Sequence, residues 1–308
     1  MKISVIIPTL NRPEDLKEAL NSILAQKLLP HEVIIVDQSE NMLTRELVEY
    51  FDVANKARGI SFIWHFRQEK GSARARNAGF RVSQGDIVCF TDDDVILEKD
   101  YFKAISRCFE TYPQIGGITG NVEVLEPPSG FKWALRKWLL KVFQIDLFNG
   151  KMSSSGFGFP LFHEEIEKME YVELFAGYSM NFRRQYLEAD LFDEFFTGYS
   201  FREDVELSYR ISRHTKLAAI PDALFEHKMS TSSRTHWKDL KKMQFNNYYY
   251  VFNKHKNHLW TSRLIFAYSI VGLLAIDFIE WLCCLKPNRW ETFTENLSAA
   301  VLLMLGKL

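Results

Sequence analysis

Hydrophobic positions in the first half of the chain follow two alternating spacings. Residues 2–8 (KISVIIP) and 32–37 (EVIIVD) are short runs rich in β-branched residues, typical of strands buried on both sheet faces. Between them, residues 12–26 repeat apolar side chains at helical spacing, with Pro13 near the first turn. The same alternation predicts further helices over 42–57, 72–84 and 99–112, and further strands over 60–66, 86–91 and 115–124. Repeated β-α-β units predict an α/β fold with a doubly wound, mainly parallel sheet flanked by helices.

The pattern changes after residues 126–130 (EPPSG). Residues 131–148 predict a helix whose apolar side chains spread around most of its circumference, and 171–184 return to strand-like spacing. Residues 200–214 predict a helix that begins with acidic residues. We therefore expect a domain over 1–228 and a helical C-terminal region over 229–308.

The C-terminal region is apolar but interrupted by charge. Residues 264–276 contain no charged side chain, and Asp277 and Glu280 follow. A membrane-spanning helix needs about 20 apolar residues, so interfacial or re-entrant helices fit better than a clean crossing. Packing in a core or in a homodimer is the alternative. From Lys228 to Arg263 there are eight Lys or Arg and one acid, which suits anionic lipid, a phosphorylated ligand or a solvated basic face.

Overall charge and cysteine content narrow the class of protein. The formal net charge is −1, which gives no support to nucleic-acid binding. The four cysteines show no disulfide spacing, so we expect a reducing compartment. The apolar run before Pro8 is too short for a signal-peptide core. These features predict a cytoplasmic protein, and the apolar C-terminal region predicts that it is peripheral to the inner face of the cell membrane.

Polar residues cluster where predicted strands end. Asp37, residues 8–13 (PTLNRP) and residues 90–95 (FTDDDV) all follow strands, and ligands of such sheets bind beyond the carboxyl ends of the strands. Asp92 and Asp94 alternate, so both carboxylates can turn toward one Mg²⁺ or Mn²⁺, which would neutralise the aspartates. The alternative is a polar turn with an aspartate capping the next helix.

Several stretches together resemble family 2 glycosyltransferases, which are inverting enzymes of the GT-A fold that use nucleotide sugars. The resemblance covers residues 3–227, about three-quarters of the chain. Its residues, in the family's order, are SVIIPTLNRPEDLKEALNSILAQ (4–26), EVIIVDQSE (32–40), EKGSARARNAGF (69–80), GDIVCFTDDDV (85–95), FAGYSMNFRR (175–184), FREDVELSYRI (201–211) and IPDALFEH (220–227).

The resemblance implies a donor site. Its nucleotide-binding residues would be Pro8, Thr9, Asn11, Asp37, Arg74, Arg76, Asn77, Asp92 and Asp93. Asp94 would bind the metal that bridges the diphosphate, Asp92 would hold ribose or metal, and His227 would add a metal or diphosphate contact. From the residues alone, Asp37 is equally a strand-end cap and His227 equally structural. A solvated helix face would explain Arg81 but not the whole stretch with Arg74, Arg76 and Asn77.

The resemblance also implies a general base. Inverting transfer needs a carboxylate to accept the acceptor's proton, and Glu203 and Asp204 supply two, of which the family pattern favours Asp204. A helix N-cap is the alternative role of Asp204. Gly177 and Tyr178 would border the acceptor.

The expected activity is non-processive. The Q-x-x-R-W signature of processive synthases is absent from residues 232–247, although its letters occur there. We therefore expect one sugar to pass from a UDP-sugar, or from a GDP- or dTDP-sugar, to a glycan or lipid-linked acceptor in surface polysaccharide synthesis. A scaffold that binds nucleotide sugar without catalysis is the alternative. A dehydrogenase is disfavoured because no G-x-G-x-x-G follows the first strand.

Overall fold

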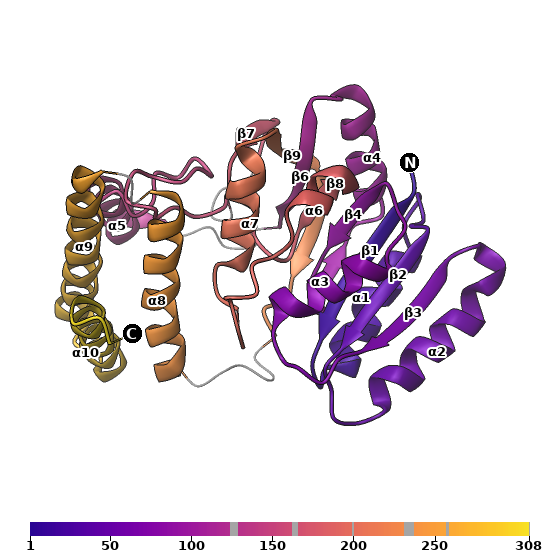
Figure 1. Cartoon of the computed structure of the whole chain (residues 1–308), viewed down its shortest axis with the longest axis horizontal. Coiled ribbons are helices and arrows are strands. Elements are labelled where there is room, and N and C mark those ends of the chain that lie inside the picture. Colours follow the sequence, from indigo (N-terminus) through magenta and orange to yellow (C-terminus); the bar gives the residue numbers. More distant parts are fainter. Residues whose placement is uncertain (124–128, 162–165, 199, 231–236, 257–258, 308) are drawn as a thin grey trace. The chain divides into compact units, whose positions relative to one another are not determined.

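The computed structural model describes residues 1–123, 129–161, 166–198, 200–230, 237–256 and 259–307 (Figure 1). It divides into two compact units. The first comprises Met1–Leu125 and Phe162–Arg234, and the second comprises Glu126–Leu161 and Thr235–Leu308. Residues 126–161, which the sequence groups with the first domain, thus belong by their contacts to the unit that contains the C-terminal helices.

The first unit is built on one sheet. Its described strands are β1 (Ile3–Thr9), β2 (Glu32–Asp37), β3 (Ser61–Phe66), β4 (Ile87–Phe90), β5 (Val95–Leu97), β6 (Ile115–Val122), β7 (Glu170–Val172), β8 (Met180–Arg183) and β9 (Lys216–His227). They lie in the order β3-β2-β1-β4-β8-β6-β9-β5, and β7 pairs with β9. Pairs β1–β2, β2–β3, β1–β4 and β6–β9 are parallel, whereas β8, β5 and β7 pair antiparallel to their neighbours. The predicted α/β class with a mainly parallel sheet is confirmed.

Helices cover both faces of this sheet. The helical elements of the unit are α1 (Pro13–Leu24), α2 (Leu43–Asn55), η1 (Lys56–Arg58), α3 (Ser72–Val82), α4 (Tyr101–Thr111), α6 (Arg184–Ala189) and α7 (Glu203–Ser212). Val5 and Ile7 point into a core shared with α1, α2 and α4. Ile6 points to the other face, where α3 lies so close that a Cβ on Gly79 would stand 2.5 Å from the Ile6 Cγ2. Successive side chains of β1 point to opposite faces of the sheet, so the strand packs against helices on both faces.

Two strands were not predicted from the sequence, and two others were predicted as one stretch. β5 and β9 were not predicted, because three residues carry no period and β9 contains Pro221 and an irregular register. The strand-like stretch 171–184 holds most of β7 and all of β8, with a loop between them. Residue 124, the last of a predicted strand, lies outside the described residues.

The second unit is helical. Its helices are α5 (Gly130–Val142), α8 (Trp237–His255), α9 (Trp260–Cys284) and α10 (Pro287–Met304). α5 is shorter than predicted, since Phe143 ends it and packs against Gly272 of α9. α10 contacts both α8 and α9. Among the described helices, one is long and apolar enough to cross a membrane by length and composition, over Trp260–Cys283.

Candidate functional site

The strand ends of the first unit come together as predicted. Register pairs Thr9 at the end of β1 with Asp37 at the end of β2. The Thr9 Oγ1 donates a hydrogen bond of 2.7 Å to the Asp93 Oδ2, which joins the turn after β1 to the turn after β4. The backbone N–H of Asn11 donates to the Ser39 Oγ at 2.8 Å. Three segments distant in the sequence therefore share one edge of the sheet.

Asp37 is fully buried at this edge. Its Oδ1 accepts a bond from the Ser39 N–H at 2.9 Å, and its Oδ2 accepts one from the Trp64 indole at 3.0 Å. Trp64, which the sequence analysis did not single out, thus fixes the carboxylate. The neighbouring Pro8 is half-buried within β1, and Asn11 is exposed with a positive φ of 57°.

The three consecutive aspartates point to three different partners. Asp92 accepts a bond of 2.7 Å from the Arg76 Nη2. Asp93 is 4% exposed and accepts from Arg12 at 3.1 Å as well as from Thr9. Burial raises the pKa of Asp93 to about 7, although Arg12 and Thr9 act in the opposite direction. Asp93 is thus tied into the protein rather than turned outward, and Arg12 is a site residue that the sequence analysis missed.

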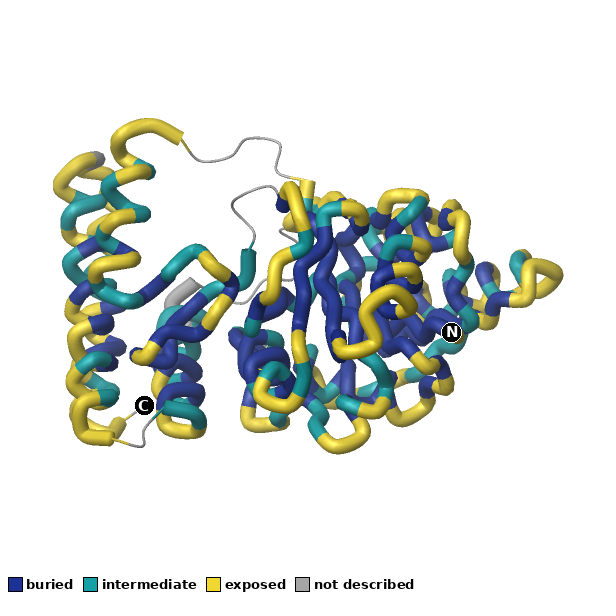
Figure 2. The backbone as a smooth tube through the Cα atoms, turned by 90° about the horizontal axis from the view of Figure 1, so that it is seen from above, coloured by how far each residue is buried: buried dark blue, intermediate teal, exposed yellow. Residues whose placement is uncertain are grey.

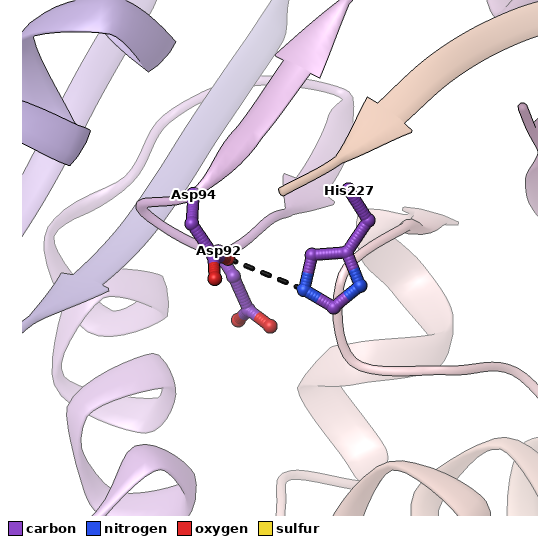
Figure 3. Close-up of side chains that lie close together, drawn as sticks. All are labelled: Asp92, Asp94 and His227. Atoms are coloured by element: carbon purple, nitrogen blue, oxygen red, sulfur yellow. Dashed lines mark ion pairs between the residues drawn. The ribbon is translucent and has the colours of Figure 1, made fainter. Parts of the chain in front are cut away.

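Asp94 lies against His227 because of strand pairing. Val95 of β5 pairs with His227 of β9, and this places the His227 Nε2 3.3 Å from the Asp94 Oδ1 (Figure 3). The Ser230 N–H donates to the Asp94 Oδ2 at 2.9 Å. Burial would raise the pKa of Asp94, but the His227 and Ser230 bonds and the charge of Arg12 outweigh it, so the pKa is lowered. Asp94 is therefore held in its charged form.

Asp92, Asp94 and His227 form a candidate metal centre. One ligand atom from each lies within 4.8 Å of the others, and Figure 3 shows the two carboxylates and the imidazole gathered at one point. Two carboxylates and one imidazole suit Mn²⁺, and the carboxylates suit Mg²⁺. The residues therefore fit a divalent cation of the predicted kind.

Arg76 connects this centre to α7. The side chain is 2% exposed, and its Nη1 donates to the Glu203 Oε1 at 2.7 Å while its Nη2 reaches Asp92. The Nη2 also lies 3.4 Å from the Gly177 carbonyl oxygen. A Cβ on Gly177 would stand 2.8 Å from that nitrogen, so Gly177 leaves room for the guanidinium. Burial lowers the pKa of Arg76, but Asp92 and Glu203 raise it by more, and the guanidinium stays charged.

The two other predicted nucleotide-binding residues of α3, Arg74 and Asn77, make different contacts. Asn77 is buried, and its amide pairs with the backbone of Phe192 in both directions, at 2.9 and 3.0 Å. Arg74 is partly exposed and contacts Glu69 and Glu194. In this structure, Asn77 supports the 192–194 loop, whereas Arg76 faces the acidic cluster.

Glu203 and Asp204 begin α7 but have different surroundings. Glu203 is buried and accepts bonds from Arg76 and, at 2.9 Å, from the Ser72 Oγ. Burial and the nearby Asp204 raise the pKa of Glu203 to about 8. Asp204 is half-buried, with its Oδ1 bound to the Val205 N–H at 2.7 Å and its Oδ2 to the Gly177 N–H at 2.8 Å. Burial raises the pKa of Asp204 against the effect of those bonds. Asp204 is the second residue of α7, and the N-cap position is occupied by Arg202, whose side chain makes no capping hydrogen bond.

The loop between β7 and β8 borders both carboxylate groups. The Tyr178 ring packs against His227 in a tilted arrangement, with ring centroids 4.8 Å apart, and its carbonyl oxygen accepts a bond from Thr91 at 3.1 Å. Gly177, next to it, contacts both Arg76 and Asp204. The loop therefore lies beside the candidate metal centre and the candidate base.

Comparisons with known proteins agree with this geometry. The family model described as "Glycosyl transferase family 2" matches residues 4–163. An uncharacterized glycosyltransferase of Nostoc sp. is 32% identical over 128 residues, which cover 41% of this chain and 38% of the relative. The glucosyl-dolichyl phosphate glucuronosyltransferase of Haloferax volcanii is 30% identical over 126 residues, covering 40% and 38%. The chain thus matches less than half the length of these curated relatives.

Solved structures resemble the chain over nearly its whole length. The mannosyltransferase PcManGT of Pyrobaculum calidifontis, solved with GDP-Man and Mn²⁺, has a TM-score of 0.60 at 16% identity, covering 100% of this chain and 88% of that one. TarS of S. aureus (residues 1–349), solved with UDP-GlcNAc, has a TM-score of 0.58 at 15% identity, covering 96% and 80%. At such identities the likeness shows the fold, and the predicted GT-A architecture is confirmed.

Proposed function

Because the chain belongs to glycosyl transferase family 2, we propose that it transfers one sugar, with inversion, from a nucleotide sugar to an acceptor hydroxyl. The observation that carries the proposal is the connection of a metal-ligand group to a carboxylate pair through one buried arginine. Asp92 and Glu203 bind the two terminal nitrogens of Arg76, each at 2.7 Å. A donor-binding group and a base are thereby held in one rigid arrangement.

Asp92, Asp94 and His227 would hold the divalent cation next to the donor diphosphate. When bound, Mg²⁺ or Mn²⁺ supplies positive charge that stabilises the departing nucleoside diphosphate. The lowered pKa of Asp94 keeps this carboxylate available as a ligand at neutral pH. Solved structures of similar fold contain Mn²⁺, GDP-Man or UDP-GlcNAc, which supports a nucleotide-sugar donor, with UDP-sugars favoured and GDP- or dTDP-sugars as alternatives.

Asp204 is the better placed base of the pair. The acceptor oxygen forms a bond to the anomeric carbon as its proton passes to the Asp204 carboxylate, and the bond from that carbon to the diphosphate breaks. Glu203 is buried and accepts bonds from Ser72 and Arg76, so it is less accessible to an acceptor. The N–H groups of Gly177 and Val205 fix the direction of the Asp204 carboxylate.

We assign the acceptor to glycans or lipid-linked glycans, with single rather than processive addition, in surface polysaccharide synthesis. The names of two curated relatives, a glucosyl-dolichyl phosphate glucuronosyltransferase and a poly-β-1,6-N-acetyl-D-glucosamine synthase, support an acceptor of this class. The lack of a Q-x-x-R-W signature supports single addition. Residues 232–236, part of the stretch in which that signature was sought, lie outside the described residues.

A thermal-shift screen tests the donor. Binding to the native protein raises its melting temperature by mass action, so a UDP-sugar with Mn²⁺ should raise it more than either component alone. Should no UDP-, GDP- or dTDP-sugar shift the melting temperature with either metal, donor binding is wrong. Measured turnover then separates an enzyme from a scaffold that binds nucleotide sugar without catalysis.

A further inference from the structure

One side of α9 is apolar and exposed to solvent. Leu264 is 60% exposed, Val271 61% and Leu282 51%. Together with Tyr268, Ala275 and Phe278 they recur alternately four and three residues apart, which aligns them along one side of the helix. Figure 2 shows exposed residues recurring along the helices of the second unit. A large exposed apolar face of this kind marks a contact with a partner or a membrane.

The two acidic residues of α9, Asp277 and Glu280, lie on its other side and are paired within the second unit. Glu280 binds Arg289 of α10 at 2.7 Å and also pairs with Arg136 of α5. The Asn296 amide of α10 donates to Asp277, and the positive charge of Lys241 on α8 acts on the same carboxylate. Surface helices of soluble proteins place charges outward and apolar residues inward. α9 has the opposite arrangement.

The neighbouring helix and the helix ends extend the apolar face. Leu297, Val301 and Met304 of α10, and Leu305 just after it, are 40 to 75% exposed. Trp260 at the start of α9 is 72% exposed and Trp290 at the start of α10 is 42% exposed. Arg263 and Lys286, both exposed, lie near the ends of α9. Tryptophan and basic residues at the ends of apolar segments are typical of proteins at a lipid–water interface.

The flanks of the α9 stripe disfavour a coiled coil with a second copy. In a coiled coil, the positions beside the apolar seam usually carry Glu and Lys, which select the partner. Here these positions hold Ile265, Gly272 and Ile279 on one side and Ala267, Leu274 and Trp281 on the other. These positions therefore carry no charge that could set the register of a coiled coil. Contact with lipid hydrocarbon requires no such charge.

Contacts within the second unit also disfavour a complete crossing. α10 packs against α8, and α8 carries Lys241, Lys242 and Gln244. If α9 crossed the bilayer, this polar helix would be drawn toward the hydrocarbon, where charged side chains are costly. An apolar face that enters only part of one leaflet avoids that cost.

We propose that the exposed face of α9 and α10 lies in the boundary between headgroups and acyl chains of a single lipid leaflet, with Asp277 and Glu280 paired on the protein side. This membrane surface is independent of the sugar-transfer site, because none of its residues belongs to that site.

The test uses the full chain and flotation with phosphatidylcholine vesicles, alone or mixed with phosphatidylglycerol. The wild type should float with both, and about 0.5 M NaCl, which shortens the screening length to a few ångströms, should leave flotation with the neutral vesicles intact. A triple variant, Leu264→Ser, Val271→Ser and Leu282→Ser, should lower the partition coefficient by about tenfold or more per side chain. The matched control is Met42→Ser, Tyr50→Ser and Val53→Ser, three exposed apolar residues of the first unit, and it should float like the wild type.

A second measurement needs no variant. Brominated lipids should quench part of the tryptophan fluorescence of the wild type, because Trp260 and Trp290 lie near the proposed face. Three results would overturn the proposal. The wild type could fail to float, it could float only with anionic vesicles at low salt, or it could be a dimer without vesicles that the triple variant dissociates.

Discussion

Asp94 in the first unit and Glu280 in the second both accept bonds from basic side chains, but they differ in charge balance. Around Asp94, five carboxyl groups (Asp92, Asp93, Asp94, Glu203 and Asp204) face three arginines (Arg12, Arg76 and Arg202) and His227. Around Glu280, counting only side chains that the structure describes, three acids (Asp277, Glu280 and Glu295) face three bases (Arg136, Lys241 and Arg289).

The difference explains what each cluster can do. Burial and, to a smaller extent, the neighbouring acids raise the pKa values of Asp93 and Glu203. The excess of acid leaves a place for a cation beside Asp92 and Asp94. The balanced cluster offers no such place, and its charges serve to join helices. The three adjacent aspartates are therefore tolerated partly through Arg76, Arg12 and His227, whereas the sequence analysis attributed their tolerance to a metal alone.

Of the changes considered, metal removal should reduce activity most, and it should act through the cluster around Asp94. EDTA should abolish transfer, and Mg²⁺ or Mn²⁺ should restore it. Mutating a residue that hydrogen-bonds to a metal ligand typically costs ~10–100-fold. Asp94→Asn changes a proposed ligand itself, so it should lower metal-dependent donor binding and turnover by more than that. Glu280→Gln is the matched control in the second unit and should keep full activity. Undiminished transfer in EDTA would show that the acidic excess serves another purpose.

Asp93 should give the first unit a pH-dependent stability. Its folded pKa of about 7 exceeds the ordinary value of 3.8, so its contribution is present below about pH 4 and is lost as the pH rises to about 7. Relative to Asp93→Asn, the wild type should lose about 2–4 kcal/mol of unfolding free energy between pH 4 and pH 8. Urea titrations in EDTA measure this difference. A difference that does not change with pH would mean that Asp93 is ionised throughout.

Glu280→Gln should have the smallest effect. The amide can still accept from Arg136 or Arg289, and the carboxylate it replaces is partly exposed, so we expect a loss of about 1 kcal/mol. Thermal unfolding measures the loss, and nucleotide-sugar affinity should not change. A loss of donor binding in this variant would contradict the separate roles of the two clusters.

Much of the sheet could be predicted, because β1 and β2 are β-branched runs that stay buried on both faces. The convergence of Thr9, Asp37 and the aspartates followed from parallel strands ending at one edge. Contacts set by distant segments could not be predicted. Arg12 reaches Asp93 across 81 residues, and Asn77 pairs with the backbone of Phe192. On α9, the sequence showed that Asp277 and Glu280 interrupt the apolar run and count against a spanning helix, but it did not show that both are paired within the second unit.

The most direct test of the central claim, that Asp204 is the base of a sugar transfer, is the turnover of Asp204→Asn measured beside its nucleotide-sugar affinity. The amide keeps the size of the side chain but cannot take up the acceptor's proton. Turnover should fall by ~10²–10⁴-fold, as is typical for a lost general base, with nearly unchanged donor affinity. Glu203→Gln should reduce turnover less, because Glu203 supports Arg76 rather than the acceptor. Full turnover in Asp204→Asn, or a larger loss in Glu203→Gln, would contradict the assignment.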